Sequence, residues 1–155
     1  MLTPILTAIH ATVVVLWIGG VSFVTIIIFP MLLQMGDSLE KVLMFQRVES
    51  IFAKQARYYA WITGITGFSL LFMKGLHTLL FTKNTVGVSI MLVAWALYTF
   101  ILTFEKKIFK ILFSDPVKHD PTKIFVLLSR FHWVILLVSL GAVCVGVGAG
   151  HGGSF

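Results

Sequence analysis

Three histidines within long apolar stretches are the residues of this sequence most able to do chemistry. His10 is the only ionisable side chain in the first 36 residues, which contain no Asp, Glu, Lys or Arg. His77 and His132 lie in further apolar stretches. An ionisable side chain inside a membrane is costly and usually functional. Because imidazoles on facing helices hold a b-type haem, these residues indicate a haem or metal site.

The depths of the three histidines predict how they pair. At about 1.5 Å per residue, His10 lies about eight residues from the outer end of its helix and His77 about five residues from the outer end of the next. His132 lies nearer the midplane, so it can pair with His10 only if the helices tilt. We predict that His10 and His77 are the axial ligands of a haem b, with His132 as the alternate ligand or the ligand of a second haem.

Two residues share a helical face with these histidines. Trp17 lies two turns after His10, and Ser139 lies two turns after His132. We predict that Trp17 belongs to the cofactor site because it shares the His10 face, and that Ser139 orients an imidazole. The competing interpretation is structural, because small and polar residues commonly mediate contacts between membrane helices. In that interpretation His77 simply faces lipid headgroups and the other histidines are hydrogen-bonding residues.

The remaining reactive residues exclude some classes of function and favour others. A single cysteine, Cys144, excludes an intrachain disulfide and a Cys-based zinc or iron–sulfur site within one chain. Met31 and Met35 lie one turn apart and suit a soft metal such as Cu(I). The carboxylates all fall outside the apolar stretches, which argues against a proton pump built on buried acids. They are Asp37, Glu40, Glu49, Glu105, Asp115 and Asp120.

The composition is that of an all-α integral membrane protein. Of the 155 residues, 58% are hydrophobic and 12% are charged, whereas a soluble domain has about 25% charged residues. No Lys or Arg precedes the first apolar stretch, so we expect a retained helix rather than a cleaved signal peptide. The formal net charge of +6 reflects membrane topology, and we expect no nucleic-acid partner.

The apolar stretches predict a single membrane domain over residues 1–155, an antiparallel bundle of four transmembrane helices. A tilt or a bend near Pro30 is expected in the first helix. Residues 39–55 alternate charged and apolar positions, as in an amphipathic helix lying at the interface. The expected helices span about residues 2–34, 56–81, 85–112 and 121–147, followed by a flexible tail over 148–155.

The distribution of positive charge predicts the orientation. Ten Lys and Arg residues flank the loops after the first and third helices, whereas only Lys74 and Lys83 lie on the other side. Because positive residues are retained in the cytoplasm, we expect both termini to face outward from a bacterial-type inner membrane. The ten are Lys41, Arg47, Lys54, Arg57, Lys106, Lys107, Lys110, Lys118, Lys123 and Arg130.

Residues 5–75 also show a family resemblance. The pattern consists of His10, Trp17, Gly19-Gly20, Phe29-Pro30, Phe52, Arg57 and Ile65-Thr66-Gly67. It resembles the small four-helix membrane proteins of the copper-resistance D superfamily, whose relatives include membrane protoporphyrinogen oxidases thought to bind haem b. The resemblance implies that His10 is a haem ligand. Since Met31 follows Pro30 where the oxidase branch has Arg, the resemblance implies a haem scaffold without porphyrinogen-oxidising activity.

Three functions follow from these patterns. The first is a membrane b-type haem protein, a haem-dependent oxidoreductase or electron carrier that works with a quinone or a redox protein at the outer half of the bilayer. The alternative is a copper or small-solute permease lined by His10, His132 and methionines. The third is a membrane anchor for other proteins, acting through residues 39–55 and the basic loops. A homo-oligomer is compatible with each function.

Overall fold

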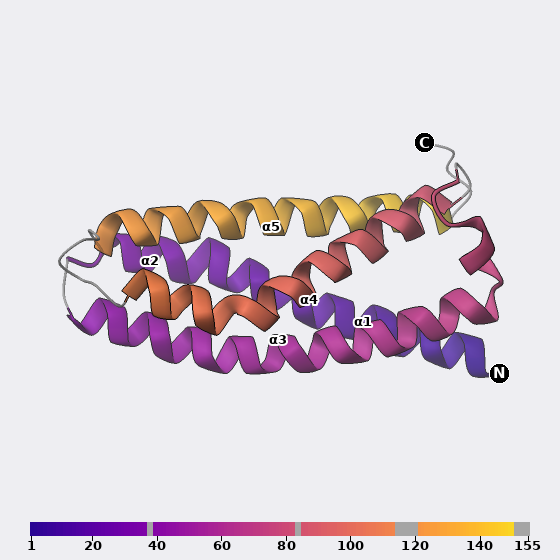
Figure 1. Cartoon of the computed structure of the whole chain (residues 1–155), viewed down its shortest axis with the longest axis horizontal. Helices are drawn as coiled ribbons and strands as arrows, with labels where there is room; N and C mark the ends of the chain where they lie inside the picture. Colours follow the sequence, from indigo (N-terminus) through magenta and orange to yellow (C-terminus); the bar gives the residue numbers. More distant parts are fainter. Residues whose placement is uncertain (37–38, 83–84, 114–120, 151–155) are drawn as a thin grey trace.

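Helices make up almost all of the computed structural model, which describes residues 1–36, 39–82, 85–113 and 121–150. Four long helical rods run side by side along the long axis of the molecule, and Leu2 and Gly150 lie at the same end (Figure 1). The elements are α1 (Leu2–Phe23), the π-helix η1 (Val24–Ile28), α2 (Phe29–Gln34), α3 (Leu39–Met73), the 3₁₀-helix η2 (Leu76–Leu79), α4 (Val86–Phe113) and α5 (Pro121–Gly150).

Three of these rods have the length and apolarity of membrane spans. Among the described residues, Leu2–Gln34, Val86–Phe104 and Lys123–Gly148 are long and apolar enough to cross a membrane, by length and composition. A bilayer core requires about 20 such residues. The predicted all-helical class and three of the four expected spans are therefore confirmed at this level. The remaining rod, α3, carries several charged residues in its first half.

The first rod contains a π-helical turn where the sequence predicts a tilt or a bend. The backbone N–H of Phe29 donates to the carbonyl of Val24, five residues earlier, at the end of η1. Pro30 follows directly, and it has no N–H to continue the α-helical ladder. The helix accommodates this missing donor by widening over one turn. Leu2–Gln34 nevertheless remains one continuous apolar rod.

The second rod differs from the prediction. We expected an interfacial segment over 39–55 and a separate helix over 56–81, but α3 is one helix from Leu39 to Met73. Charged residues change the surroundings of a helix without breaking it, and neither Gly nor Pro occurs between Leu39 and Thr63. The helix ends at Met73, two residues before Gly75, whose φ of 66° is left-handed and typical of the residue that follows a helix C-terminus. At the other end of the chain, α5 continues to Gly150, three residues beyond the predicted boundary.

Buried apolar side chains join the rods in two clusters. One cluster lies near η1, α2 and the start of α5, and includes Phe29 and Phe125, both fully buried. The other lies around Trp17 and Leu136. A glycine allows α3 and α4 to pack closely beside the second cluster, because a Cβ at Gly64 would lie 2.7 Å from Cζ2 of Trp95. The glycines of α3 therefore serve packing between helices.

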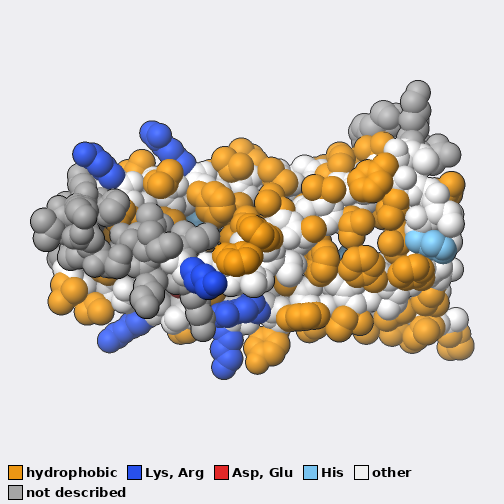
Figure 2. Space-filling view, viewed as in Figure 1, with side chains coloured by type: hydrophobic (Ala, Val, Ile, Leu, Met, Phe, Trp, Pro, Cys, Tyr) orange, Lys and Arg blue, Asp and Glu red, His pale blue; other side chains and the backbone are white. Residues whose placement is uncertain are grey.

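Positive side chains concentrate at one end of the molecule. Figure 2 shows Lys and Arg gathered toward the end where α2 stops and α5 starts. Lys41 is an exception in being buried, with Nζ 3.4 Å from the carbonyl oxygen of Met35 and 5.1 Å from the centre of the Phe125 ring. Lys41 therefore holds the start of α3 against both α2 and α5.

Candidate membrane histidine site

His10 faces α3 and forms a hydrogen bond with Thr66. The His10 Nδ1 and Thr66 Oγ1 atoms lie 2.9 Å apart. The Thr66 hydroxyl has one hydrogen, which it donates to the carbonyl of Ile62 at 2.7 Å, so Thr66 accepts from His10. With the Thr66 hydrogen donated to Ile62, the tautomer of neutral His10 that fits this geometry has its proton on Nδ1 and its lone pair on Nε2.

Gly67 allows the His10 ring to lie directly against α3. A Cβ at Gly67 would lie 3.1 Å from Cε1 of His10, closer than an ordinary contact. Thr66 and Gly67 thus form a platform on α3 for the ring: one orients it by a hydrogen bond, and the other leaves room for it. Both residues belong to the sequence pattern that carries the family resemblance.

Thr63 adds an unusual polar group beside this platform. Its side chain is only 7% exposed, and its Oγ1 has no hydrogen-bond partner among the described residues. An unsatisfied buried hydroxyl costs about 1–3 kcal/mol. Thr63 lies one turn before Thr66 on the same helix. The surroundings of His10 therefore contain a free hydroxyl in addition to the oriented imidazole.

His132 lies on α5, in the other half of the molecule. Its Nδ1 is 2.9 Å from the carbonyl oxygen of Leu128, which can only accept, so Nε2 again carries the lone pair. The ring packs 4.7 Å from Phe29. Phe29 lies 19 residues beyond His10 in the first rod, about 28 Å along the axis. Two imidazoles on one metal bring their nitrogens within about 4 Å, so the structure keeps His10 and His132 apart.

His77 lies on η2, beyond the end of α3. Its side chain is exposed, and its ring packs 5.0 Å from Phe72. Phe72 lies five residues beyond Gly67, about 8 Å further along α3. The structure therefore does not place His77 opposite His10. Its exposure agrees with the second interpretation of the sequence, in which His77 faces headgroups.

Trp17 and Ser139 meet at a residue that the sequence analysis did not select, Tyr98. The ring of Trp17 is buried and lies edge-on to Tyr98, with centres 4.9 Å apart. The Tyr98 hydroxyl bonds to Ser139 Oγ and lies 3.1 Å from the carbonyl oxygen of Ile135. The side chain of Ser139 therefore forms its hydrogen bond across the helices with Tyr98. The signal available in the sequence was a lone phenol within an apolar span, since a buried Tyr hydroxyl needs a partner.

The described residues include no group of three His, Cys, Asp or Glu side chains that could hold a metal ion. A haem requires fewer protein ligands than a metal ion alone, because the porphyrin supplies four nitrogens and the protein supplies one or two ligands. The two buried or half-buried histidines lie apart, His10 in one half of the molecule and His132 in the other.

Comparisons with known protein families, with curated proteins and with solved structures give no match for this chain. The relation to the copper-resistance D superfamily thus remains a prediction from the sequence pattern. The assignment of function depends on the residues around His10.

Proposed function

We propose that this protein is an integral membrane b-type haem protein in which His10 is the iron ligand. The hydrogen bond from His10 Nδ1 to Thr66 carries the proposal. Histidines that bind metals almost always donate their second ring nitrogen in this way, which fixes the tautomer and orients the ring. The arrangement leaves Nε2 as the ligand atom.

The proposed architecture is an antiparallel bundle of four transmembrane helices. The three apolar rods supply three spans, and residues 58–73 of α3, which carry no charged side chain, supply the fourth. Both termini face outward from a bacterial inner membrane, because the Lys and Arg side chains concentrate at the opposite end. His10 then lies in the outer half of the bilayer.

The residues near His10 fit a haem bound through a single histidine. Gly67 holds the ring against α3, Thr66 fixes its tautomer, and the Thr63 hydroxyl provides a further polar group. A bound haem would supply one-electron chemistry of iron, and His10 would be the residue of this platform that holds it. We therefore revise the predicted pairing and assign His77 no role in ligation. His132 would take part only by holding a separate, second haem.

Visible spectroscopy of the purified protein tests this proposal. The protein would be expressed in haem-replete cells, purified in detergent and measured before and after reduction with dithionite. We expect a Soret band and a reduced α-band that are abolished by His10→Ala. The matched change His77→Ala should leave both bands intact, because His77 is exposed and distant from the platform. A featureless spectrum of the unmodified protein would refute the proposal and favour the permease.

A further inference from the structure

Three positively charged side chains border the seam between α3 and α4, in the half of the molecule that carries the positive end. They are Lys54 and Arg57 on α3 and Lys107 on α4, and we call them the seam cations. Lys54 and Lys107 are exposed, and Arg57 is half-buried. Figure 2 shows Lys and Arg side chains gathered toward the middle of the molecule, where α3 and α4 run side by side in Figure 1.

A hydrogen bond between the two helices fixes the position of Arg57 at this seam. The helices are antiparallel, and Trp95 Nε1 on α4 donates to the carbonyl of Ala60 on α3 at 2.9 Å. The Trp95 ring also packs on Gly64. Arg57 lies seven residues before Gly64, which places it two turns away on the same side of α3. Arg57 therefore lies at the edge of α3 that borders α4.

The side chains of Arg57 and Lys107 reach toward the same level of the seam. Arg57 Nε donates to the carbonyl of Ala53 at 3.1 Å, so the guanidinium lies back along α3 toward the positive end. Lys107 Nζ lies 5.7 Å from the centre of the Phe104 ring, so it reaches back along α4 in the opposite direction. Ala53 and Phe104 lie about 10 Å and about 14 Å beyond the hydrogen bond between the helices, on the same side of it. The two charges therefore converge from opposite directions.

The described part of the chain supplies no anion for the seam cations. From Ser50 to Phe104 the sequence contains no Asp or Glu. None of the three cations forms an ion pair with a described carboxylate, and Arg57 uses only one of its five N–H donors within the described residues. The other four donors are available to an anion from outside the chain.

Exposed aromatic side chains continue from the seam cations toward the other end of the molecule. Tyr58 and Trp61 on α3 are 60% and 68% exposed, and Phe100 on α4 is 62% exposed. Tyr and Trp at such positions typically lie at the boundary between headgroups and hydrocarbon. A ligand with a phosphate at the cations and hydrocarbon chains along the aromatic rings would use both features, whereas a free anion would use only the first.

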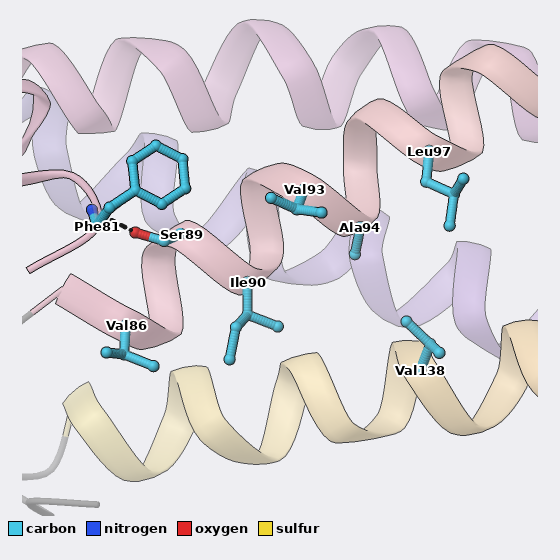
Figure 3. Close-up of a pocket in the computed structure, with 8 residues that line it drawn as sticks. All are labelled: Phe81, Val86, Ser89, Ile90, Val93, Ala94, Leu97 and Val138. Carbon is cyan, nitrogen blue, oxygen red and sulfur yellow. Dashed lines mark hydrogen bonds between the residues drawn. The ribbon is translucent and has the colours of Figure 1, made fainter. Parts of the chain in front are cut away.

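A pocket of about 420 Å³ near the start of α4 lacks such charges. Figure 3 shows a lining that is apolar apart from the Ser89 hydroxyl. That hydroxyl donates to the carbonyl of Thr85 at 3.0 Å and accepts from the backbone N–H of Phe81 at 2.9 Å. No polar side chain of this described lining is left to select a ligand, so the seam is the more specific surface of α4.

We infer that the seam cations bind the headgroup phosphate of an anionic phospholipid of the inner leaflet. Basic sites between membrane helices on the cytoplasmic side recognise such headgroups. A zwitterionic headgroup fits less well, because its own ammonium group would be repelled by three cations that lack a described carboxylate. The inference rests on the membrane span proposed for residues 58–73 and is independent of the haem.

Native mass spectrometry of the detergent-purified, full-length protein tests this inference. Phosphatidylglycerol and phosphatidylcholine with identical acyl chains would be titrated separately, and the unmodified protein should bind phosphatidylglycerol more tightly. The double variant Arg57→Gln/Lys107→Gln should weaken that binding by roughly 25-fold, because each cation near an anionic headgroup contributes about a factor of five. Phosphatidylcholine binding should stay the same. The matched control is Lys74→Gln/Arg130→Gln, which removes two exposed positive charges away from the seam and should keep the preference.

A single variant covers the case in which the double variant does not fold. Lys54→Gln changes an exposed side chain and should weaken phosphatidylglycerol binding by about fivefold. Equal affinity of the unmodified protein for the two lipids, or equal losses in the seam and control variants, would overturn the inference. Displacement of the lipid by inorganic phosphate at the same concentration would also overturn it. A preference lost only from the seam variants, in protein without haem, would support the lipid site while refuting the proposed function.

Discussion

At the scale of single residues, the environment of His10 depends on a glycine. Gly67→Ala should displace the ring, because the new Cβ would lie 3.1 Å from Cε1 of His10. We expect weaker haem binding, by roughly 10- to 100-fold as for other changes that disturb an oriented metal ligand. Titration of haem into the apoprotein, followed by the Soret band, measures this effect.

Gly19→Ala is the control for this change. A Cβ at Gly19 would meet nothing within 4 Å, so the substitution should stabilise α1 by about 0.5–1 kcal/mol, the usual difference between Gly and Ala in a helix. Haem affinity should not change. Equal effects of the two substitutions on haem binding would show that the ring does not rest on Gly67.

At the scale of helices, Tyr98 joins α4 to α5 by its hydroxyl and to α1 by its ring. Tyr98→Phe keeps the contact with Trp17 and removes the bonds to Ser139 and Ile135. We expect the free energy of unfolding to fall by about 0.6–1 kcal/mol, the usual worth of a hydrogen bond between membrane helices. Thermal unfolding in detergent would measure the loss.

The matched control is Tyr58→Phe, because Tyr58 is 60% exposed on α3. Removing the exposed Tyr58 hydroxyl should leave the unfolding temperature nearly unchanged. The haem spectrum should be the same in both variants, since Tyr98 bonds to Ser139 and Ile135 rather than to a histidine. A spectrum altered by Tyr98→Phe alone would mean that this residue belongs to the cofactor site.

The sequence predicted helices well and their junctions less well. Long uncharged runs predict membrane spans because the bilayer sets their length. The predicted boundaries of the first span agree with those of the structure, Leu2–Gln34. The expected boundary at residue 55 rested on charged residues, which do not end a helix. At its other end the helix was predicted to run to residue 81, but it stops just before Gly75. Because the depth of His77 was counted from residue 81, the prediction placed His77 level with His10. Contacts across helices, such as His10 with Thr66, depend on rotation of each rod and were not predicted.

At the scale of the whole molecule, the proposed topology places the ends of the bundle on opposite sides of the membrane. In a background with Cys144→Ser, Lys74→Cys and Lys107→Cys introduce thiols at exposed positions near opposite ends. We expect a membrane-impermeant maleimide to label position 74 in intact cells, because the positive end stays in the cytoplasm. Position 107 should be labelled only after permeabilisation. The reverse pattern would invert the orientation and place His10 in the inner half.

The central claim is that His10 Nε2 binds the iron, and chemical rescue tests it most directly. His10→Gly removes the ligand and leaves space for a free imidazole in its place. We predict that the purified variant lacks the Soret band and regains it when haem and imidazole are added together. His132→Gly, measured in parallel, should keep its band without imidazole. A His10→Gly protein that retains its haem, or that imidazole does not restore, would contradict the account.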